Sequence, residues 1–405
     1  MITRTPSYDL SSRNTFRMKV KCALYVEVTE EADLQALDWD SLPQPVFVMG
    51  GGSNLLFRGD FPGTVLHIGI KTDFGRGVIL TSTPSPSKPA SEVLRATLAG
   101  RGVTDEMTPR PEVTIGAGTV FDDFCAWAAS ENLWGPENLS LIPGECGASA
   151  VQNIGAYGVE AKDIIASIHV WDTLEHKFVD IDPAECQYGY RTSRFKTEWK
   201  GRYVITSVTY RLSKEPNPIL DYGGVRKAIE ESCGGILSQT CGHPRPHKRE
   251  GPIEDGRGRS EAETVWEGIS PQLIRDTIIG IRRKKLPDPE EIGSAGSFFC
   301  NPVISKEHFE RIVKTAKEDN GEDYEVPHYV VGDMIKVPAA WMIEQCGFKG
   351  AKLGGAQVYQ NQPLVIVNAT GSATPEEIIG LEQRIIDTIA SKYGITLHPE
   401  VEHIN

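Results

Sequence analysis

Residues 46–56 read Val46-Phe-Val-Met-Gly-Gly-Gly-Ser-Asn-Leu-Leu56, a short apolar run that passes directly into three consecutive glycines. Such a run is typical of a buried strand, and glycines without Cβ atoms let successive backbone N–H groups converge on one point. The result is an anion-binding nest, whose natural occupant is a diphosphate. The pattern is not G-x-G-x-x-G, because Leu55 replaces the last glycine, and no GK[ST] of a Walker loop follows. Taken alone, the segment is equally compatible with a tight turn.

The composition describes an ordinary soluble globular protein with room for two or three domains: 405 residues, 40% hydrophobic and 24% charged. A net charge of −13 leaves no excess of Lys and Arg to neutralise a phosphate backbone, which argues against a nucleic-acid partner. The first residues lack the apolar core of a signal peptide, and no apolar run reaches the roughly 20 residues that span a bilayer. We therefore expect a cytoplasmic protein with no membrane partner, and no obligate protein partner is evident.

The eight cysteines are scattered and include no CxxC pair. This spacing predicts reduced thiols and argues against a tetrahedral zinc site. The nearest approach to a ligand pair is Cys241-Gly-His243, which lies in low-complexity sequence. We predict no metal site.

Residues 141–158 are unusually rich in small side chains, from Leu141-Ile-Pro-Gly144 to Gly155-Ala-Tyr-Gly158. Such a run makes a poor self-supporting core but a good surface for backbone to press against a large planar ligand. Gln152 and Asn153 would offer amide donors and acceptors to that ligand. The alternative is a glycine-rich loop packed against protein.

Two further segments carry candidate chemistry. In Tyr188–Lys196, two tyrosines and Arg191 form either an exposed loop or a lip that clamps an anion, with Arg191 donating to a carboxylate. In Glu291–Pro302, Ser297 follows Gly293, Ala295 and Gly296 and precedes two phenylalanines. A serine placed in this way meets little steric hindrance from a flat ligand. The bland alternative is a glycine turn that leads into a buried strand.

Periodicity and punctuation predict the main elements. The expected strands are 46–49, 64–70, 77–80, 164–172, 177–181, 204–212, 354–358, 364–367 and a short strand in 397–405, and the apolar-to-glycine patterning resumes at 113–119. The expected helices are 121–130, 271–283, 308–316, 336–347 and one that starts with a capping box at Thr374-Pro-Glu-Glu377. We expect a Ser/Pro/Thr-rich loop insertion near 81–112 and a disordered insertion at 233–265.

Several of these segments resemble one family in their order and spacing. They are GGGSNLL, LIPG, VQNIGAYG, YGYRTSRFK, KLPDP, GSAGSFFCNP, KVPAAWMIEQCG and HPEV. The family is UDP-N-acetylenolpyruvoylglucosamine reductase, and the resemblance covers nearly the whole chain outside the two insertions. VQNIGAYG with AGSFF is specific, whereas GGGSN is shared by other flavoproteins of the same fold. YGYRTSRFK looks like the longer class of the family, in which a tyrosine-bearing loop closes over substrate.

The resemblance implies an α+β fold with a two-part FAD-binding region of the PCMH/VAO type and a separate α/β substrate-binding domain. Subdomain 1 would comprise 1–72 with the C-terminal 397–405, subdomain 2 would comprise 73–213, and the substrate domain 214–396. It further implies an enzyme with FAD as cofactor and NADPH as co-substrate. This enzyme reduces UDP-N-acetylglucosamine enolpyruvate to UDP-N-acetylmuramate in peptidoglycan precursor synthesis, and so serves cell-wall biogenesis, cell shape and division. The rival is another FAD oxidoreductase of the same fold that acts on a hydroxy acid or sugar.

The resemblance also assigns residues. The catalytic positions are Arg191, Ser297 and Glu400, with Ser297 as proton donor and the other two holding the carboxylate and the enolic intermediate. The FAD positions are Gly50, Gly51, Gly52, Ser53, Asn54, Gly118, Pro143, Gly144, Gly147 and Arg282. The substrate positions are Tyr157, Tyr190, Lys285, Asn301, Tyr329, Lys336 and Gln362.

Some positions depart from the family pattern. Cys300 stands where lysine is common, and Glu402 stands where an arginine often lies near the flavin. His328 is an alternative to Tyr329. Because a serine alone is a weak acid, its competence requires a cationic neighbour or a water relay, and Lys285 is the candidate.

Overall fold

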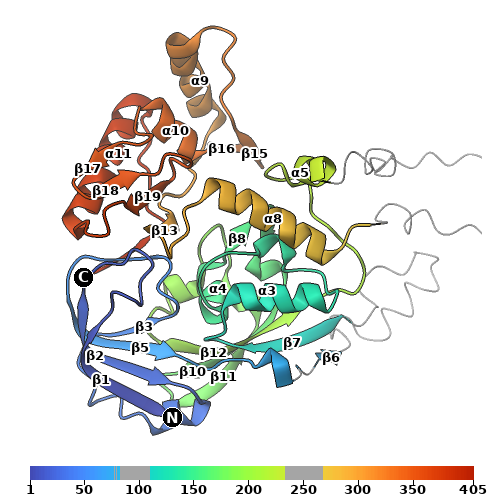
Figure 1. Cartoon of the computed structure of the whole chain (residues 1–405), viewed down its shortest axis with the longest axis vertical. Coiled ribbons are helices and arrows are strands. Elements are labelled where there is room, and N and C mark those ends of the chain that lie inside the picture. Colours follow the sequence, from blue (N-terminus) through green and yellow to red (C-terminus); the bar gives the residue numbers. More distant parts are fainter. Residues whose placement is uncertain (77, 79, 83–109, 233–267) are drawn as a thin grey trace, which may run out of the picture. The chain divides into compact units, whose positions relative to one another are not determined.

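A computed structural model describes residues 1–76, 78, 80–82, 110–232 and 268–405 (Figure 1). They form two units, Met1–Gly69 with Arg282–Asn405, and Ile70–Ile281. The insertion expected at 233–265, most of the one near 81–112 and the Cys241–His243 pair lie outside the described residues. The three predicted domains are defined by the ligand that each would bind, and that division stays a prediction.

The first unit contains a four-stranded sheet in the order β1-β2-β5-β3, in which β2, β5 and β3 are parallel and β1 is antiparallel to β2. Its elements are β1 (Ile2–Asp9), β2 (Lys21–Val28), α1 (Glu31–Ala36), β3 (Val46–Met49) and β5 (Phe61–Ile68). β3 has the bounds that the sequence predicts. β4 (Leu55–Phe57) pairs in parallel with β20 (Glu402–Ile404). The Gly50–Asn54 loop therefore connects β3, which pairs with β5, to β4, which pairs with β20.

The remainder of this unit contains two further sheets, in the orders β13-β19-β18-β17 and β14-β16-β15. The elements are β13 (Gly293–Ser297), β14 (Val303–Ile304), α9 (Lys306–Asn320), β15 (Tyr329–Val331), β16 (Met334–Lys336), α10 (Ala339–Gln345), β17 (Lys352–Leu353), β18 (Ala356–Val358), β19 (Val365–Asn368) and α11 (Pro375–Tyr393). One hydrophobic core joins these elements to the first sheet and includes the buried Phe57, Phe298 and Phe299.

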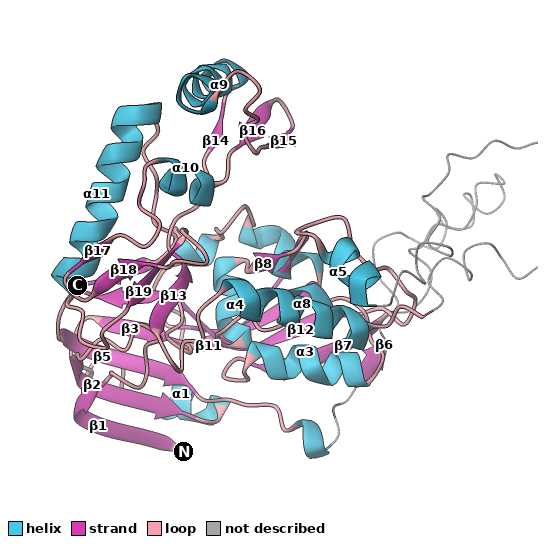
Figure 2. Ribbon diagram, turned by 45° about the horizontal axis from the view of Figure 1, so that its top comes forward, coloured by secondary structure: helices cyan, strands magenta, loops and turns pink. Residues whose placement is uncertain are grey.

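Helix α11 follows its sequence signals closely. The Thr374 hydroxyl accepts the Glu377 N–H, the Glu377 carboxylate accepts the Thr374 N–H, and Gly394 ends the helix at φ +66°. The four positions expected to face inward, Ile378, Leu381, Ile385 and Ile389, are all fully buried. Figure 2 shows this helix beside β17 and β18.

The second unit is built on an antiparallel sheet in the order β11-β10-β12-β7-β6. Its elements are β6 (Leu80–Ser82), β7 (Pro111–Gly116), α3 (Phe121–Ser130), α4 (Cys146–Gln152), β8 (Gly155–Ala156), β9 (Val159–Glu160), β10 (Ile165–Asp172), β11 (Lys177–Ile181), β12 (Tyr203–Arg211), α5 (Val225–Ser232) and α8 (Pro271–Lys285). Short 3₁₀ turns lie at 74–76, 137–139, 161–163, 183–186 and 194–196. α8 begins in this unit, and its last four residues belong to the first.

Helices α5 and α8 pack in the second unit through a cluster that includes Trp134, Val225, Ile229, Ile274 and Ile278. On α8, the guanidinium of Arg275 donates two hydrogen bonds to Asp122 of α3, at 2.5 and 2.9 Å. These hydrogen bonds raise the pKa of Arg275. Arg275 is buried and Asp122 is half-buried, so loss of the Asp122 carboxylate would leave the guanidinium in the interior without this partner.

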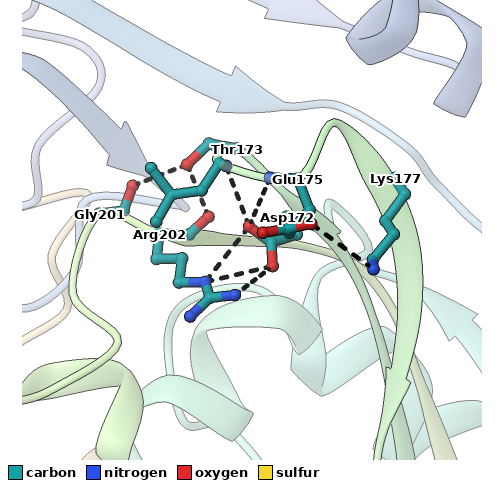
Figure 3. A network of polar contacts seen from close by, with 7 residues as sticks. Asp172, Thr173, Glu175, Lys177, Gly201 and Arg202 are labelled. Atoms are coloured by element: carbon teal, nitrogen blue, oxygen red, sulfur yellow. Dashed lines mark hydrogen bonds and ion pairs between the residues drawn. The ribbon is translucent and has the colours of Figure 1, made fainter.

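A second charge network closes the end of β10 (Figure 3). The Asp172 carboxylate accepts hydrogen bonds from the N–H groups of Leu174 and Glu175 and from the Arg202 guanidinium, the last at 2.7 Å. Thr173 donates through its hydroxyl to the Arg202 carbonyl. Asp172 is 1% exposed, so this turn depends on a buried carboxylate whose acceptor sites are filled.

Two expectations need correction. The predicted helix 336–347 is strand β16 followed by helix α10, because Pro338 breaks the element and becomes the N-cap of α10. The small-residue run contains α4, which we did not expect. Its alanines favour helix, and its glycine approaches neighbouring backbone.

Candidate active site

Ser297 lies at the end of β13, immediately after a bulge. The pairing of β13 with β19 shifts register between Ser294 and Ser297, and Gly296 adopts φ +70° there. A bulge with a left-handed glycine bends a strand and re-aims the next side chain. No atom lies within 4 Å of a Cβ built on Gly296, so conformation rather than space requires a glycine. Ser297 is half-buried, between this bulge and the fully buried Phe298.

Glu400 and the Gly50–Asn54 loop are joined by hydrogen bonds to each other and to the segment that follows Ser297. The Glu400 N–H donates to the Phe298 carbonyl at 2.8 Å, and the Asn54 side chain donates to the Glu400 carbonyl at 3.0 Å. The Glu402 N–H in turn donates to the Asn54 carbonyl. Three segments far apart in sequence therefore meet, and each carries a predicted site residue.

The substrate positions of this unit also lie on connected backbone. Tyr329 and Lys336 face one another in the β15–β16 pair, and Lys336 is paired with Val303 on its other side. The Asn301 side chain accepts the Ala339 N–H at the start of α10. The carbonyl of Gln362 accepts the Val365 N–H, at the strand position paired with Ser297.

His328, the alternative to Tyr329, and the remaining predicted positions of this unit have different surroundings. The His328 ring packs on Phe309, and its Nδ1 is 2.9 Å from the Val326 carbonyl. Lys285 is exposed at the end of α8, and within the described residues no hydrogen bond joins it to Ser297. The Arg282 Nε is buried one turn earlier. Cys300 donates its N–H to the His398 carbonyl.

The Gly50–Asn54 loop is shaped by Gly52. This residue has φ +65°, and its carbonyl accepts the Thr15 N–H. A Cβ on Gly52 would lie 2.0 Å from the Arg13 carbonyl oxygen, so no other residue fits without moving backbone. A left-handed residue in a glycine run is the backbone pattern of an anion nest.

In the second unit, the predicted cofactor positions lie on two adjacent segments. The Phe121 N–H donates to the Gly144 carbonyl, the Gly147 N–H donates to the Ala117 carbonyl, and the Gly118 N–H donates to the Ile70 carbonyl. A Cβ on Gly147 would lie 2.8 Å from that of Ala117, so glycine permits this approach. Pro143 lies in the same segment, just before Gly144.

The predicted substrate residues of the second unit cluster around the β8–β9 hairpin. The Arg191 guanidinium donates to the Gly155 carbonyl at 2.6 Å and lies 5.6 Å from the centre of the Tyr190 ring. Tyr157 and Arg191 have φ values of +48° and +57°, which are uncommon for residues with side chains. The Asn138 amide donates to the Tyr157 carbonyl and to the Ile219 carbonyl, both at 2.8 Å.

Asn153 was expected to offer its amide to a ligand, and that expectation is wrong. The residue is fully buried, and its Nδ2 donates to Glu160 and to the Gly189 carbonyl, both at 2.9 Å. Its Oδ1 accepts the Lys162 N–H. Burial raises the pKa of Glu160, but hydrogen bonds from Lys162 and Asn153 and the nearby positive charges outweigh it, so the pKa lies below its ordinary value.

Each unit thus brings its own predicted residues together: Ser297, Glu400 and Asn54 in the first, and Arg191, Tyr190 and Tyr157 in the second. No motif in the sequence marks Asn138, which donates to the Tyr157 carbonyl, or Glu160, which accepts from Asn153. Within the described ranges, no group of three His, Cys, Asp or Glu residues is placed to hold a metal. Among the helices of those ranges, none has the length and apolar character to cross a membrane.

Comparison with known proteins identifies the family. The model for the UDP-N-acetylenolpyruvoylglucosamine reductase C-terminal domain matches residues 288–404, and that for an FAD binding domain matches residues 100–175. The UDP-N-acetylenolpyruvoylglucosamine reductase of Bacteroides fragilis (strain YCH46) is 36% identical over 399 residues, 98% of this chain and 99% of that protein. The chain belongs to the UDP-N-acetylenolpyruvoylglucosamine reductase family.

Further reductases of the family extend the comparison. The enzyme of Porphyromonas gingivalis (strain W83) is 37% identical over 404 residues, 98% of either chain. The crystal structure of the reductase from Thermus caldophilus matches with a TM-score of 0.57 at 17% identity, covering 100% of this chain and 99% of that one. That likeness shows the fold. The family resemblance and the α+β class, with an FAD-binding domain and a separate C-terminal domain, are confirmed.

Proposed function

We propose that the protein is an FAD-dependent reductase that converts UDP-N-acetylglucosamine enolpyruvate to UDP-N-acetylmuramate, with NADPH as electron donor. Family membership over the full chain supports the reaction. The observation that carries the assignment of residues is the placement of Ser297 after a glycine bulge and before Phe298, whose carbonyl accepts the Glu400 N–H, while the Asn54 side chain donates to the Glu400 carbonyl. In this proposal the enzyme serves peptidoglycan synthesis, and so cell shape and division, in the cytoplasm.

The residues present fit FAD. The proposed cofactor set, Gly50–Asn54, Gly118, Pro143, Gly144 and Gly147, contains no carboxylate, which suits an anionic diphosphate. Gly52 supplies the left-handed conformation that a nest requires, and Arg282 would add a positive charge. When bound, FAD would pass to the substrate the hydride that it receives from NADPH.

Hydride addition at the vinyl carbon leaves an enolic carboxylate, whose charge must be stabilised while the neighbouring carbon receives a proton. In this proposal the Ser297 hydroxyl donates that proton, and the Arg191 guanidinium donates hydrogen bonds to the carboxylate. Glu400 stabilises the enolic form, either protonated or bridged by Arg191, because two like charges side by side disfavour double ionisation. Lys285 is proposed as the cation that raises the acidity of Ser297, through side-chain motion or a water.

The substrate positions Tyr157, Tyr190, Asn301, Tyr329, Lys336 and Gln362 are proposed to bind the nucleotide sugar. Lysine and tyrosine side chains suit a diphosphate and a uracil or sugar ring. The pairing of Tyr329 with Lys336 supports Tyr329 over His328 in this role.

The test is to measure the two half-reactions separately in Ser297→Ala. We expect NADPH to reduce the flavin at a near-normal rate, and the enolpyruvyl substrate to reoxidise it about 10²–10⁴-fold more slowly, the usual contribution of a general acid. Ser294→Ala, in the same strand, is the matched control and should leave both steps unchanged. Equal loss in both half-reactions would contradict the role of Ser297. A wild-type protein that binds no FAD, or whose NADPH oxidation is not accelerated by the substrate, would refute the function itself.

A further inference from the structure

We propose that Asn153 is a positioning residue whose side-chain amide fixes the turn carrying Arg191, and thereby the guanidinium that holds the substrate carboxylate. This inference rests on the function proposed above. It concerns a residue that touches neither substrate nor cofactor in that proposal, because its side chain is directed into the protein.

The side-chain amide of Asn153 makes hydrogen bonds to three neighbouring residues. A primary amide has two N–H donors and one acceptor oxygen. Both donors are used, on the Glu160 carboxylate and the Gly189 carbonyl, and the oxygen accepts the Lys162 N–H. Asn153 therefore joins the end of α4, the β8–β9 hairpin and the Gly189 turn at one buried point.

The turn at Gly189 carries Arg191 and is closed by reciprocal backbone hydrogen bonds between Gly189 and Thr192, at 3.0 and 3.3 Å. It is held at both ends. Asn153 binds the Gly189 carbonyl, and beyond Arg191 the Ser193 hydroxyl donates to the Val151 carbonyl at 2.6 Å.

Arg191 itself donates to the Gly155 carbonyl. The three hydrogen bonds all join the turn to residues 151–155, so this short segment determines the position of the Arg191 guanidinium.

The backbone explains why asparagine stands here. Asn153 caps α4 in the left-handed region, at φ +47° and ψ +59°, which glycine adopts readily and asparagine or aspartate adopts more often than other residues do. Glycine would keep the backbone but lose the amide. Aspartate would keep the shape but present oxygens to the Gly189 carbonyl and the Glu160 carboxylate, where donors are needed. Among these residues, only asparagine meets both requirements.

Asn153→Gly removes the amide at a backbone position that suits glycine, so it is the first variant to test in the FAD-loaded enzyme. We expect flavin content and reduction by NADPH to stay within twofold of wild type, and reoxidation by the enolpyruvyl substrate to slow at least tenfold. Asn132→Gly is the matched control, because Asn132 also has a positive φ (+54°) in the same unit but is exposed. It should leave both half-reactions unchanged.

A double variant distinguishes positioning of Arg191 from a general loss of local structure, because only positioning makes the effects of the two substitutions on reoxidation non-additive. If Asn153 acts through Arg191, then Asn153→Gly should slow reoxidation less than twofold further in an Arg191→Ala background. A tenfold further loss there would overturn the inference, as would a single variant that reoxidises like wild type. Failure of the wild type to reduce the substrate would instead refute the proposed function.

If Asn153→Gly does not fold, Ser193→Ala takes its place. It removes the attachment at the other end of the turn, and we expect it to slow reoxidation at least threefold with the same non-additivity. Wild-type reoxidation in a folded Ser193→Ala would overturn the inference.

Discussion

Two turns of the second unit are held by hydrogen-bond networks that differ in kind. At Asp172–Lys177, a buried carboxylate is matched to a guanidinium and to backbone N–H groups (Figure 3). At Gly189–Thr192, the attachments made by Asn153, Ser193 and Arg191 all end on neutral carbonyls. Hydrogen bonds to neutral carbonyls fix the second turn, whereas the first turn matches a buried carboxylate to a guanidinium. We infer that the first network serves stability and the second serves chemistry.

The largest effect should come from the second turn. Removing the guanidinium in Arg191→Ala should slow reoxidation of the flavin by substrate about 10²–10³-fold, as the loss of one donor to a developing oxyanion does. The reductive half-reaction should be nearly unaffected. Rapid mixing of reduced enzyme with substrate measures the effect.

Arg194→Ala tests whether any arginine of this segment would have the same effect. Arg194 pairs with Glu198 and stacks on Trp199, 4.2 Å from the ring centre. Its loss should leave reoxidation unchanged. Similar losses in the two variants would show that Arg191 has no specific role in reoxidation.

The Asp172 turn should respond in stability instead. Asp172→Asn keeps the shape but places an amide against donors, and should lower the free energy of unfolding by about 2 kcal/mol. Denaturant titration measures the change, and turnover per folded molecule should remain that of wild type. Glu175→Gln is the control, because it removes only an exposed ion pair with Lys177. It should lower the free energy of unfolding by less than about 0.5 kcal/mol. A loss of turnover in folded Asp172→Asn would contradict the division between the two turns.

A smaller effect than that of Asp172→Asn is expected from the dependence of stability on acid pH. Because the pKa of Glu160 is lowered in the folded protein, its ionised form contributes stability that is fully present above the ordinary value of 4.5 and is lost as pH falls through the folded pKa. Wild type should exceed Glu160→Gln in unfolding free energy by less than about 1 kcal/mol above that value. The difference should shrink as the pH falls. A constant or growing difference in acid would show that ionisation of Glu160 is not what stabilises the hairpin.

Sequence patterns predict regular elements well where local signals agree. β3, α3 and β11 have the expected bounds, and the capping box at Thr374 forms as expected. Local signals fail at α4, where glycines and small residues obscure a helix. They fail again at Lys336, where one apolar run is divided between a strand and a helix.

In the candidate site, too, local motifs identify some residues and fail to identify others. Motifs name Ser297, Arg191 and Glu400, but they do not indicate which amide holds which turn. Asn153 lies inside a quoted motif and was still assigned to a ligand, because its partners Gly189 and Glu160 come from elsewhere in the chain. Hydrogen bonds between segments distant in sequence leave no local pattern to read. The meeting of Ser297 with Arg191 stays a prediction.

The parallel pairing of β4 with β20 has a consequence for synthesis. Asn54 emerges from the ribosome early, yet its side chain bonds to Glu400, 346 residues later. The loop that would hold the diphosphate therefore lacks this hydrogen bond until Glu400 has been synthesised. A chain that stopped before Glu400 would lack this closure, and we expect it to take up the cofactor poorly.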